Sequence, residues 1–294
     1  MEIAYLREHK IDVIKLSILT ILLVLLYFPT FSMFIYDWSN DENYSHGFLV
    51  PFIVGYLVWT KRDRLRETIP KPSLAGLFML ICGILVYLFG TIGTEWFVRR
   101  ASLIIVLGGL ILYLYGVFCF KTLLFPLGYL IFMVPLPAVI YSTIAFRLQL
   151  LVSRVSAGVI ALIGIPVHRN GNIIEVASGP LAVEEACSGM RSIMALLALS
   201  SLFAYILYRT KLRQWILVAF ALPVAVVTNI IRVTVTGIAA HYLGREVAEG
   251  VLHDSFGWLV FVLAFILLFL VSKLLNRILP EKPQELPSLS KNDG

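Results

Sequence analysis

The chain is organised around the segment Val183-Glu184-Glu185-Ala186-Cys187-Ser188-Gly189-Met190-Arg191-Ser192, which leads into a long apolar run from Ile193 to Tyr208. A thiol at the N-terminus of a helix lies at the positive end of the helix dipole, and a nearby arginine strengthens the effect. Both favour the thiolate, which is the nucleophilic form of cysteine. Cysteines in apolar helices more often act as small apolar fillers, so Cys187 by itself leaves a catalytic and a packing role open.

The composition is that of a membrane protein. Of the 294 residues, 59% are hydrophobic and 14% are charged, and the mean hydropathy is +0.89. A soluble domain has a much smaller apolar share, so most of this chain must lie in a bilayer. The first apolar run, Ile14 to Phe34, is too long for a signal-peptide core, so we expect it to be retained as a span. We expect one membrane domain over residues 1–279 and a disordered cytoplasmic tail over residues 280–294.

The apolar stretches predict an all-α polytopic fold with about eight transmembrane helices, each of which needs about 20 mostly apolar residues. Pro135 and Pro137 predict a break in helical structure. The segment 143–166 after this break carries two arginines, and we expect it to lie along the outer interface rather than to cross the bilayer. The expected spans are residues 14–35, 47–60, 73–93, 101–119, 122–142, 190–208, 214–240 and 255–276.

Between residues 167 and 186 the pattern changes from helix to strand. Residues 167–176 are typical of a strand pair with an Asn170-Gly171 turn, and Ser178-Gly179-Pro180 indicates a second turn. A small β element is therefore expected directly before Cys187.

The distribution of basic residues predicts the orientation of the spans, because cytoplasmic loops are enriched in lysine and arginine. Sixteen of the 24 basic residues, including all nine lysines, fall on one side of the expected spans. Both chain termini lie on that side, which we take to be the cytoplasmic face of the inner (cytoplasmic) membrane. Cys187 and the β element are then expected on the extracytoplasmic face.

A second polar site lies inside the expected span 214–240. Asn229 and Arg232 are three residues apart and share a helix face. A charge inside a span is costly and faces the protein interior or a water-filled cavity, which makes Arg232 a candidate functional residue. A structural or snorkelling arginine is the alternative interpretation.

A third polar site is His253, at the beginning of the last span. The expected topology brings Cys187, Arg232 and His253 to one face of the membrane from three different spans. A thiol, a base that titrates near neutral pH and a fixed cation can together perform acyl transfer. The alternative is an incidental histidine in the cap region of a helix, where Asp254 or Ser255 can act as N-cap.

At these residues the sequence resembles the exosortase/archaeosortase family of membrane-embedded cysteine transpeptidases, in its bacterial exosortase-like branch. The segment around Cys187 is similar to the cysteine box of that family, and Asn229-Ile230-Ile231-Arg232 to its arginine motif. His253 with Gly257 is similar to its histidine motif. The stretch Asn43-Tyr44-Ser45-His46-Gly47-Phe48 resembles its entry to the second span.

The resemblance implies a membrane protease that sorts exported proteins. Such enzymes cleave a C-terminal signal, which consists of a short motif (Pro-Glu-Pro in bacteria), a transmembrane helix and a basic tail. Cleavage forms a thioester with the cysteine, and an acceptor then takes the acyl group. The expected partners are exported substrates with this signal, the lipid bilayer and a glycan or lipid acceptor, whereas no nucleic acid, metal or other cofactor is expected.

The resemblance assigns catalytic roles to Cys187, Arg232 and His253. Supporting or substrate-binding roles are expected for five further residues, His46, Ser188, Gly189, Arg191 and Asn229. The acidic residues near His46 suggest cation or substrate binding at this position, and a solvated loop is the alternative.

Two other functional classes fit the composition. A small-molecule or glycan-lipid transporter would use Arg232 in a translocation path, although the sequence has none of the internal repeats of such proteins. A non-catalytic assembly factor for polysaccharide export is the other alternative. Replacement of Cys187 separates the three, because only the enzyme must lose its turnover.

Overall fold

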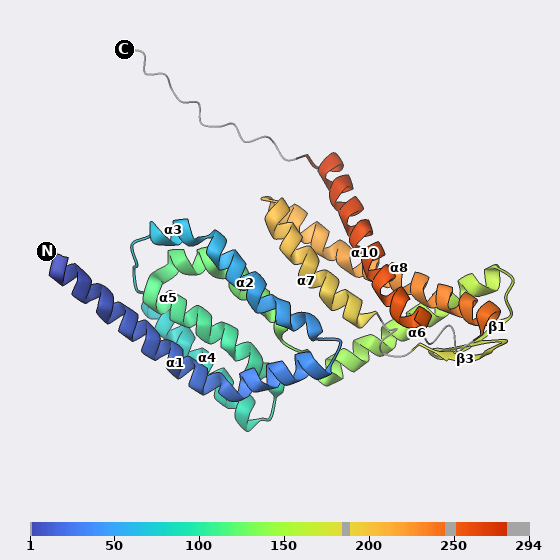
Figure 1. The fold of residues 1–294 in the computed structure, drawn as a ribbon, viewed down its shortest axis with the longest axis horizontal. Helices are drawn as coiled ribbons and strands as arrows, with labels where there is room; N and C mark the ends of the chain where they lie inside the picture. Colours follow the sequence, from blue (N-terminus) through green and yellow to red (C-terminus); the bar gives the residue numbers. More distant parts are fainter. Residues whose placement is uncertain (1, 184–188, 245–250, 281–294) are drawn as a thin grey trace, which may run out of the picture. The chain divides into compact units, whose positions relative to one another are not determined.

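The computed structural model describes residues 2–183, 189–244 and 251–280, and for 2–13, 16 and 251–258 it describes the backbone alone. Helices dominate, and one three-stranded sheet interrupts them (Figure 1). The elements in chain order are α1 (Glu2–Asn40), the 3₁₀ helix η1 (Ser45–Phe48), α2 (Leu49–Thr60), α3 (Arg62–Arg66), α4 (Leu74–Ile92), α5 (Trp96–Tyr129), the 3₁₀ helix η2 (Leu130–Met133), α6 (Ala138–Leu162), β1 (Val167–Asn170), β2 (Ile173–Val176), β3 (Gly179–Ala182), α7 (Met190–Leu207), α8 (Lys211–Leu243) and α10 (Val251–Ile278).

The helices confirm the predicted all-α polytopic membrane fold with a small β element. Among the described residues, seven helical segments are long and apolar enough to cross a membrane, and Ser45–Thr60 is a shorter apolar segment. The membrane orientation and the side of the β element stay predictions. The chain divides into two compact units, residues 1–141 and residues 142–294, which are described separately below.

A hairpin of α4 and α5 forms the centre of the first unit. Glycines recur every seven residues on α4, and each of them lies against the α5 backbone. A Cβ atom added to Gly90 would lie 2.6 Å from the nitrogen of Arg99, and one added to Gly83 would lie 3.0 Å from that of Val106. Gly76 lies against Tyr113 in the same way. Small residues let two helices approach until their backbones touch, which is how helices pack where lipid replaces water.

The predicted pair of spans 101–119 and 122–142 has its counterpart in α5 with η2, where the non-helical residue Gly116 separates two helices. The bounds differ from the prediction, because the first helix begins at Trp96 and the second ends with η2 at Met133 rather than at residue 142. Gly116 has a φ of 83°, and its Cα lies against the carbonyl oxygen of Lys71, so a side chain fits neither the conformation nor the space. The predicted break at Pro135 and Pro137 is confirmed.

The helix after that break begins at Ala138, five residues earlier than the sequence predicted. This helix, α6, runs to Leu162 and is long and apolar enough to span a membrane. Its predicted position along the outer interface stays a prediction.

The second unit is built around the sheet. Its strands follow one another in the order β1-β2-β3, and both pairings are antiparallel. The predicted Asn170-Gly171 turn is confirmed, since Asn170 pairs with Ile173 across a two-residue connection. One face of the sheet packs on α6 and α8 and forms a buried apolar core. Its members include Val152 and Ile160 of α6, Ile174 and Val183 of the sheet region, and Val233 and Ala240 of α8.

Helices α7, α8 and α10 pack against one another in the same unit (Figure 1). The buried hydroxyl of Tyr208, just after α7, lies 2.7 Å from the Ser272 hydroxyl of α10. Phe203 of α7 and Phe265 of α10 have ring centroids 5.7 Å apart. These contacts fasten α10 to α7 at a distance from the sheet.

Candidate active site around the cysteine segment

The structure describes the two ends of the cysteine segment. Cys187 and Ser188 lie outside the described residues, as do Glu184 and Glu185. The described chain stops at Val183 after β3 and resumes at Gly189 before α7. His253 belongs to the first turn of α10, and only its backbone is described.

Gly189 lies directly against Asn229. It is the N-cap of α7 and has a φ of 84°, a left-handed conformation that glycine adopts without strain. A Cβ atom at this position would lie 3.1 Å from Nδ2 and 3.3 Å from Cβ of Asn229. Any larger residue would therefore push the start of α7 away from α8. Gly189 and Asn229 are the two predicted supporting residues that the structure brings into contact.

Asn229 and Arg232 lie one turn apart on α8. Asn229 is 1% exposed, and its neighbour Thr228 is fully buried with its hydroxyl bonded 2.9 Å from the carbonyl oxygen of Val224. Arg232 is half-buried, as is Arg191 in the first turn of α7. Asn229 therefore lies in the protein interior, where a polar side chain needs protein partners, whereas Arg232 lies at its edge.

Val183 fixes the other end of the cysteine segment. Its backbone nitrogen donates to the carbonyl oxygen of Asn172 at 2.9 Å, which extends the β2–β3 ladder by one pair. The side-chain amide of Asn172 returns a hydrogen bond to the carbonyl oxygen of Val183 at 3.3 Å. Val183 is 2% exposed. Both backbone polar groups of Val183 therefore bond to one residue, which holds this residue at the end of the sheet.

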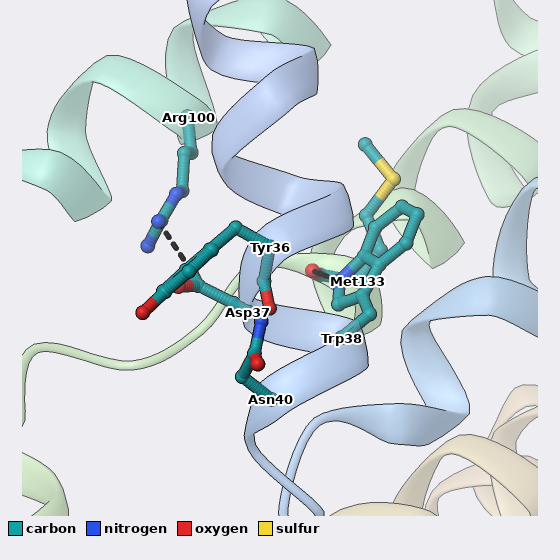
Figure 2. Close-up of polar contacts among 6 residues, drawn as sticks. All are labelled: Tyr36, Asp37, Trp38, Asn40, Arg100 and Met133. Carbon is teal, nitrogen blue, oxygen red and sulfur yellow. Dashed lines mark hydrogen bonds and ion pairs between the residues drawn. The ribbon is translucent and has the colours of Figure 1, made fainter.

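His46 lies in the first unit and helps to hold a structural junction there. Its Nε2 atom lies 3.1 Å from the carbonyl oxygen of Phe132, between α5 and the proline break. Gly47 lies against the Trp38 ring, where a side chain would overlap the indole. The N–H of this indole donates to the carbonyl oxygen of Met133 at 3.1 Å, and Figure 2 shows the two residues next to each other. The Asn43–Phe48 stretch thus joins the end of α1 to the end of α5.

Asp37 near the end of α1 forms an ion pair with Arg100 of α5 (Figure 2). The Arg100 side chain is 8% exposed and that of Asp37 is 25% exposed. Both line a cavity of about 800 Å³ together with Tyr36, Glu95 and other residues. Asp37 is therefore partly buried and paired, whereas Asp41 bonds to Asn43 at 2.9 Å. In the part of the chain that the structure describes, no group of three His, Cys, Asp or Glu residues could hold a metal ion.

The sequence alone did not single out Asn172 or its partner on α6, Gln149. The Asn170-Gly171-Asn172 stretch signalled a turn, and nothing in that pattern signals that the second asparagine bonds to the chain eleven residues later. The contact between Asn172 and Val183 could be inferred only once the register between β2 and β3 was known.

Comparison with known families agrees with the motifs found along the chain. The family model of transmembrane exosortases matches residues 38–270, which include the His46 stretch, the cysteine segment, the arginine motif and His253. No curated protein and no solved structure matches the chain. The match covers well over half of the 294 residues. This chain, a multi-pass membrane protein, therefore belongs to the transmembrane exosortase family.

Proposed function

We propose that this protein is a membrane cysteine transpeptidase that removes a C-terminal sorting signal from exported proteins. Cys187 is the nucleophile, His253 exchanges the protons, and Arg232 is a fixed cation for the developing oxyanion. Membership of the exosortase family supports the reaction class.

The contact between Gly189 and Asn229 is the observation that carries this assignment. Cys187 precedes Gly189 by two residues, so chain length alone limits the distance between their Cα atoms to about 7 Å. Arg232 follows Asn229 by three residues, which is about 4.5 Å along the helix axis. Covalent connectivity therefore keeps the proposed nucleophile near the turn of α8 that bears the proposed oxyanion ligand.

The reaction proceeds in two balanced steps. The Cys187 thiolate attacks the carbonyl carbon of the scissile bond, the C–N bond breaks, and His253 gives a proton to the leaving amine. The thioester is then attacked by an acceptor hydroxyl or amine, which loses a proton to His253 and releases the thiolate. Arg232 donates hydrogen bonds to the oxyanion of both tetrahedral intermediates.

The substrate is an exported protein whose C-terminus carries a short Pro-Glu-Pro-like motif, a transmembrane helix and a basic tail. The acceptor is a glycan, a lipid or water. We place the reaction on the extracytoplasmic face of the inner membrane, with both termini in the cytoplasm. The distribution of lysines along the chain supports this orientation.

The test uses a reporter with this C-terminal signal, co-expressed with the full-length protein. Cys187→Ala should leave the reporter at its full length, while the variant itself accumulates in the membrane at the normal level. Cys82→Ala and Cys119→Ala are matched controls, because these cysteines lie in α4 and α5 and should leave cleavage unchanged. A wild-type thioester intermediate should be released by hydroxylamine. Normal cleavage by Cys187→Ala would exclude the cysteine mechanism and leave the transporter and assembly-factor alternatives.

A further inference from the structure

Three buried polar side chains lie on one face of α6. Gln149, Ser153 and Ser156 are four and three residues apart, which is the spacing of neighbours along a helix surface. Gln149 is 6% exposed, and both serines are fully buried. Burial of a polar group in an apolar fold costs free energy unless it is hydrogen-bonded, so the partners of these three groups reveal what they hold in place.

Each of the three bonds to a segment outside α6. The side-chain oxygen of Gln149 accepts a hydrogen bond from the Asn172 amide at 3.4 Å. The Ser153 hydroxyl lies 3.0 Å from the carbonyl oxygen of Gly171, in the turn between β1 and β2. The Ser156 hydroxyl donates to the carbonyl oxygen of Ile230 in α8 at 3.2 Å. This polar stripe therefore connects one rigid helix to both the sheet and the arginine motif.

Two hydrogen bonds connect the stripe to the beginning of the cysteine segment. Gln149 holds the Asn172 amide, and the same amide group bonds to the carbonyl oxygen of Val183. Val183 is the last described residue before Cys187, four positions further along the chain. A shift of the Asn172 side chain would change the direction in which the chain enters the cysteine segment.

A further hydrogen bond connects the stripe to the arginine motif. Ile230 lies between Asn229 and Arg232 in the same turn of α8. The hydrogen bond from Ser156 therefore holds that turn against α6. Gly237, further along α8, also packs on Ile160 of α6, where an added Cβ atom would lie 2.6 Å from the Ile160 side chain. The α6–α8 contact thus has little freedom to slide.

We propose that Gln149, Asn172 and Ser156 are positioning residues, which set the distance between the cysteine segment and Arg232. The inference rests on the proposed function, since these residues act through Cys187 and Arg232. A displacement of about 1 Å at a reacting centre can lower a rate about 100-fold, because the oxyanion ligand no longer meets the attacked carbonyl. The three side chains act through the segments that they hold.

The matched control comes from the same unit. Tyr208 and Ser272 also form a buried hydrogen bond between two elements, but this bond holds α7 to α10 and touches neither proposed segment. Tyr208→Phe therefore removes two buried hydrogen bonds, to the carbonyl oxygen and to the hydroxyl of Ser272. Its expected cost in stability, about 1 to 2 kcal/mol, is at least that expected for Ser156→Ala.

The experiment compares Ser156→Ala, Asn172→Ala and Gln149→Leu with Tyr208→Phe in the full-length protein. Thermal unfolding in detergent should show small destabilisation of all four, about 1 kcal/mol for each hydrogen bond lost. Cleavage of the reporter should fall about 10- to 100-fold in Ser156→Ala, Asn172→Ala and Gln149→Leu and stay within about threefold of wild type in Tyr208→Phe. The rate at which iodoacetamide alkylates Cys187 distinguishes the contact to the cysteine segment from the contact to α8. Asn172→Ala and Gln149→Leu should change this rate more than Ser156→Ala does.

Two outcomes would overturn the proposal. If Ser156→Ala, Asn172→Ala and Gln149→Leu cleave the reporter at the rate of Tyr208→Phe, these three residues only stabilise the fold. A loss of cleavage that follows the loss of folded protein equally in all four variants would lead to the same conclusion. Failure of the proposed function gives a different result, because Cys187→Ala would then process the reporter whatever happens at the stripe.

Discussion

The α4–α5 contact of the first unit and the contacts of α6 in the second unit are made by different means. In the first unit, α4 and α5 touch through glycines at Gly76, Gly83 and Gly90, so contact requires no polar group at all. In the second unit, α6 reaches the sheet and α8 through the buried side chains of Gln149, Ser153 and Ser156. Apolar packing is sufficient to assemble helices in a membrane, so the polar contacts of the second unit call for another explanation.

Arg100 and Arg232 show the same contrast at the level of single charges. Arg100 forms an ion pair with Asp37 inside the first unit, which identifies it as part of the packing between α1 and α5. Arg232 is half-buried on α8, one turn from the residue that contacts Gly189. A charge inside a span is thus not by itself a sign of catalysis, and its neighbours decide between a structural and a chemical role. We expect changes in the first unit to affect stability and changes in the second to affect turnover.

The largest effect is expected at Gly76. A Cβ atom there overlaps the backbone nitrogen of Tyr113, which cannot move without opening the hairpin, so Gly76→Ala should prevent accumulation of folded protein. Gly55→Ala in α2 is the control, because nothing lies within 4 Å of an added Cβ at that position. Membrane-fraction yield and size-exclusion profiles in detergent measure the difference. Equal behaviour of the two variants would show that the hairpin tolerates a wider separation.

The ion pair of the first unit should give the next largest effect. Asp37→Ala leaves the Arg100 guanidinium buried without its carboxylate, which should destabilise the protein by about 3 kcal/mol. Asp37→Ala combined with Arg100→Leu should be more stable than Asp37→Ala alone, since the unpaired charge is gone. Thermal unfolding of the two single variants and the double variant measures this coupling. If the two substitutions destabilise additively, the pair contributes nothing beyond its separate side chains.

Arg232 and His253 should affect turnover and leave stability nearly unchanged. Lysine keeps the charge but loses the planar fork of donors, so Arg232→Lys should lower the cleavage rate about 100-fold at every pH. His253→Gln should instead remove the near-neutral limb of the pH–rate profile, because glutamine cannot exchange a proton. Reporter cleavage between pH 5 and pH 9 measures both. A wild-type profile for His253→Gln would leave Glu184 and Glu185 as the next candidate bases.

Apolar runs and turn residues were sufficient to predict the helices, the Asn170-Gly171 turn and the break at Pro135 and Pro137. The sequence did not reveal the bend at Gly116, since a glycine in an apolar run gives no sign that its backbone lies against the carbonyl oxygen of Lys71. The bounds of α6 were shifted rather than its length, because the helix begins at Ala138, directly after the proline break, and not at residue 143.

Prediction of the site was limited in another way. Motifs identified single residues such as Cys187, Asn229 and Arg232, because each lies in an unusual local sequence. They could not identify Gln149 or Asn172, whose role depends on contacts between segments far apart along the chain. The same limit applied to His46, whose motif suggested a supporting site, and whose contact with the Phe132 carbonyl oxygen became apparent only in the fold.

His46 should give the smallest effect, and it tests whether the first unit contributes to stability alone. Burial lowers the pKa of His46 below its ordinary value of 6.5, although the hydrogen bond to Phe132 raises it in part. The unfolded chain then binds a proton more readily than the folded protein, so stability should fall as the pH drops below about 6.5. The slope for this one group is at most about 1.4 kcal/mol for each pH unit. Thermal unfolding between pH 7.5 and pH 5 measures it.

Glutamine at this position separates a structural from a supporting role. Its amide can donate to the Phe132 carbonyl oxygen as the imidazole does, but it does not titrate, so His46→Gln should lose this contribution to the pH dependence. Reporter cleavage at pH 7.5 should stay within about threefold of wild type if the side chain acts through its bond between η1 and η2. A 100-fold loss of cleavage at unchanged stability would instead place His46 among the residues that support the reaction. The first unit would then contribute to turnover as well as to stability.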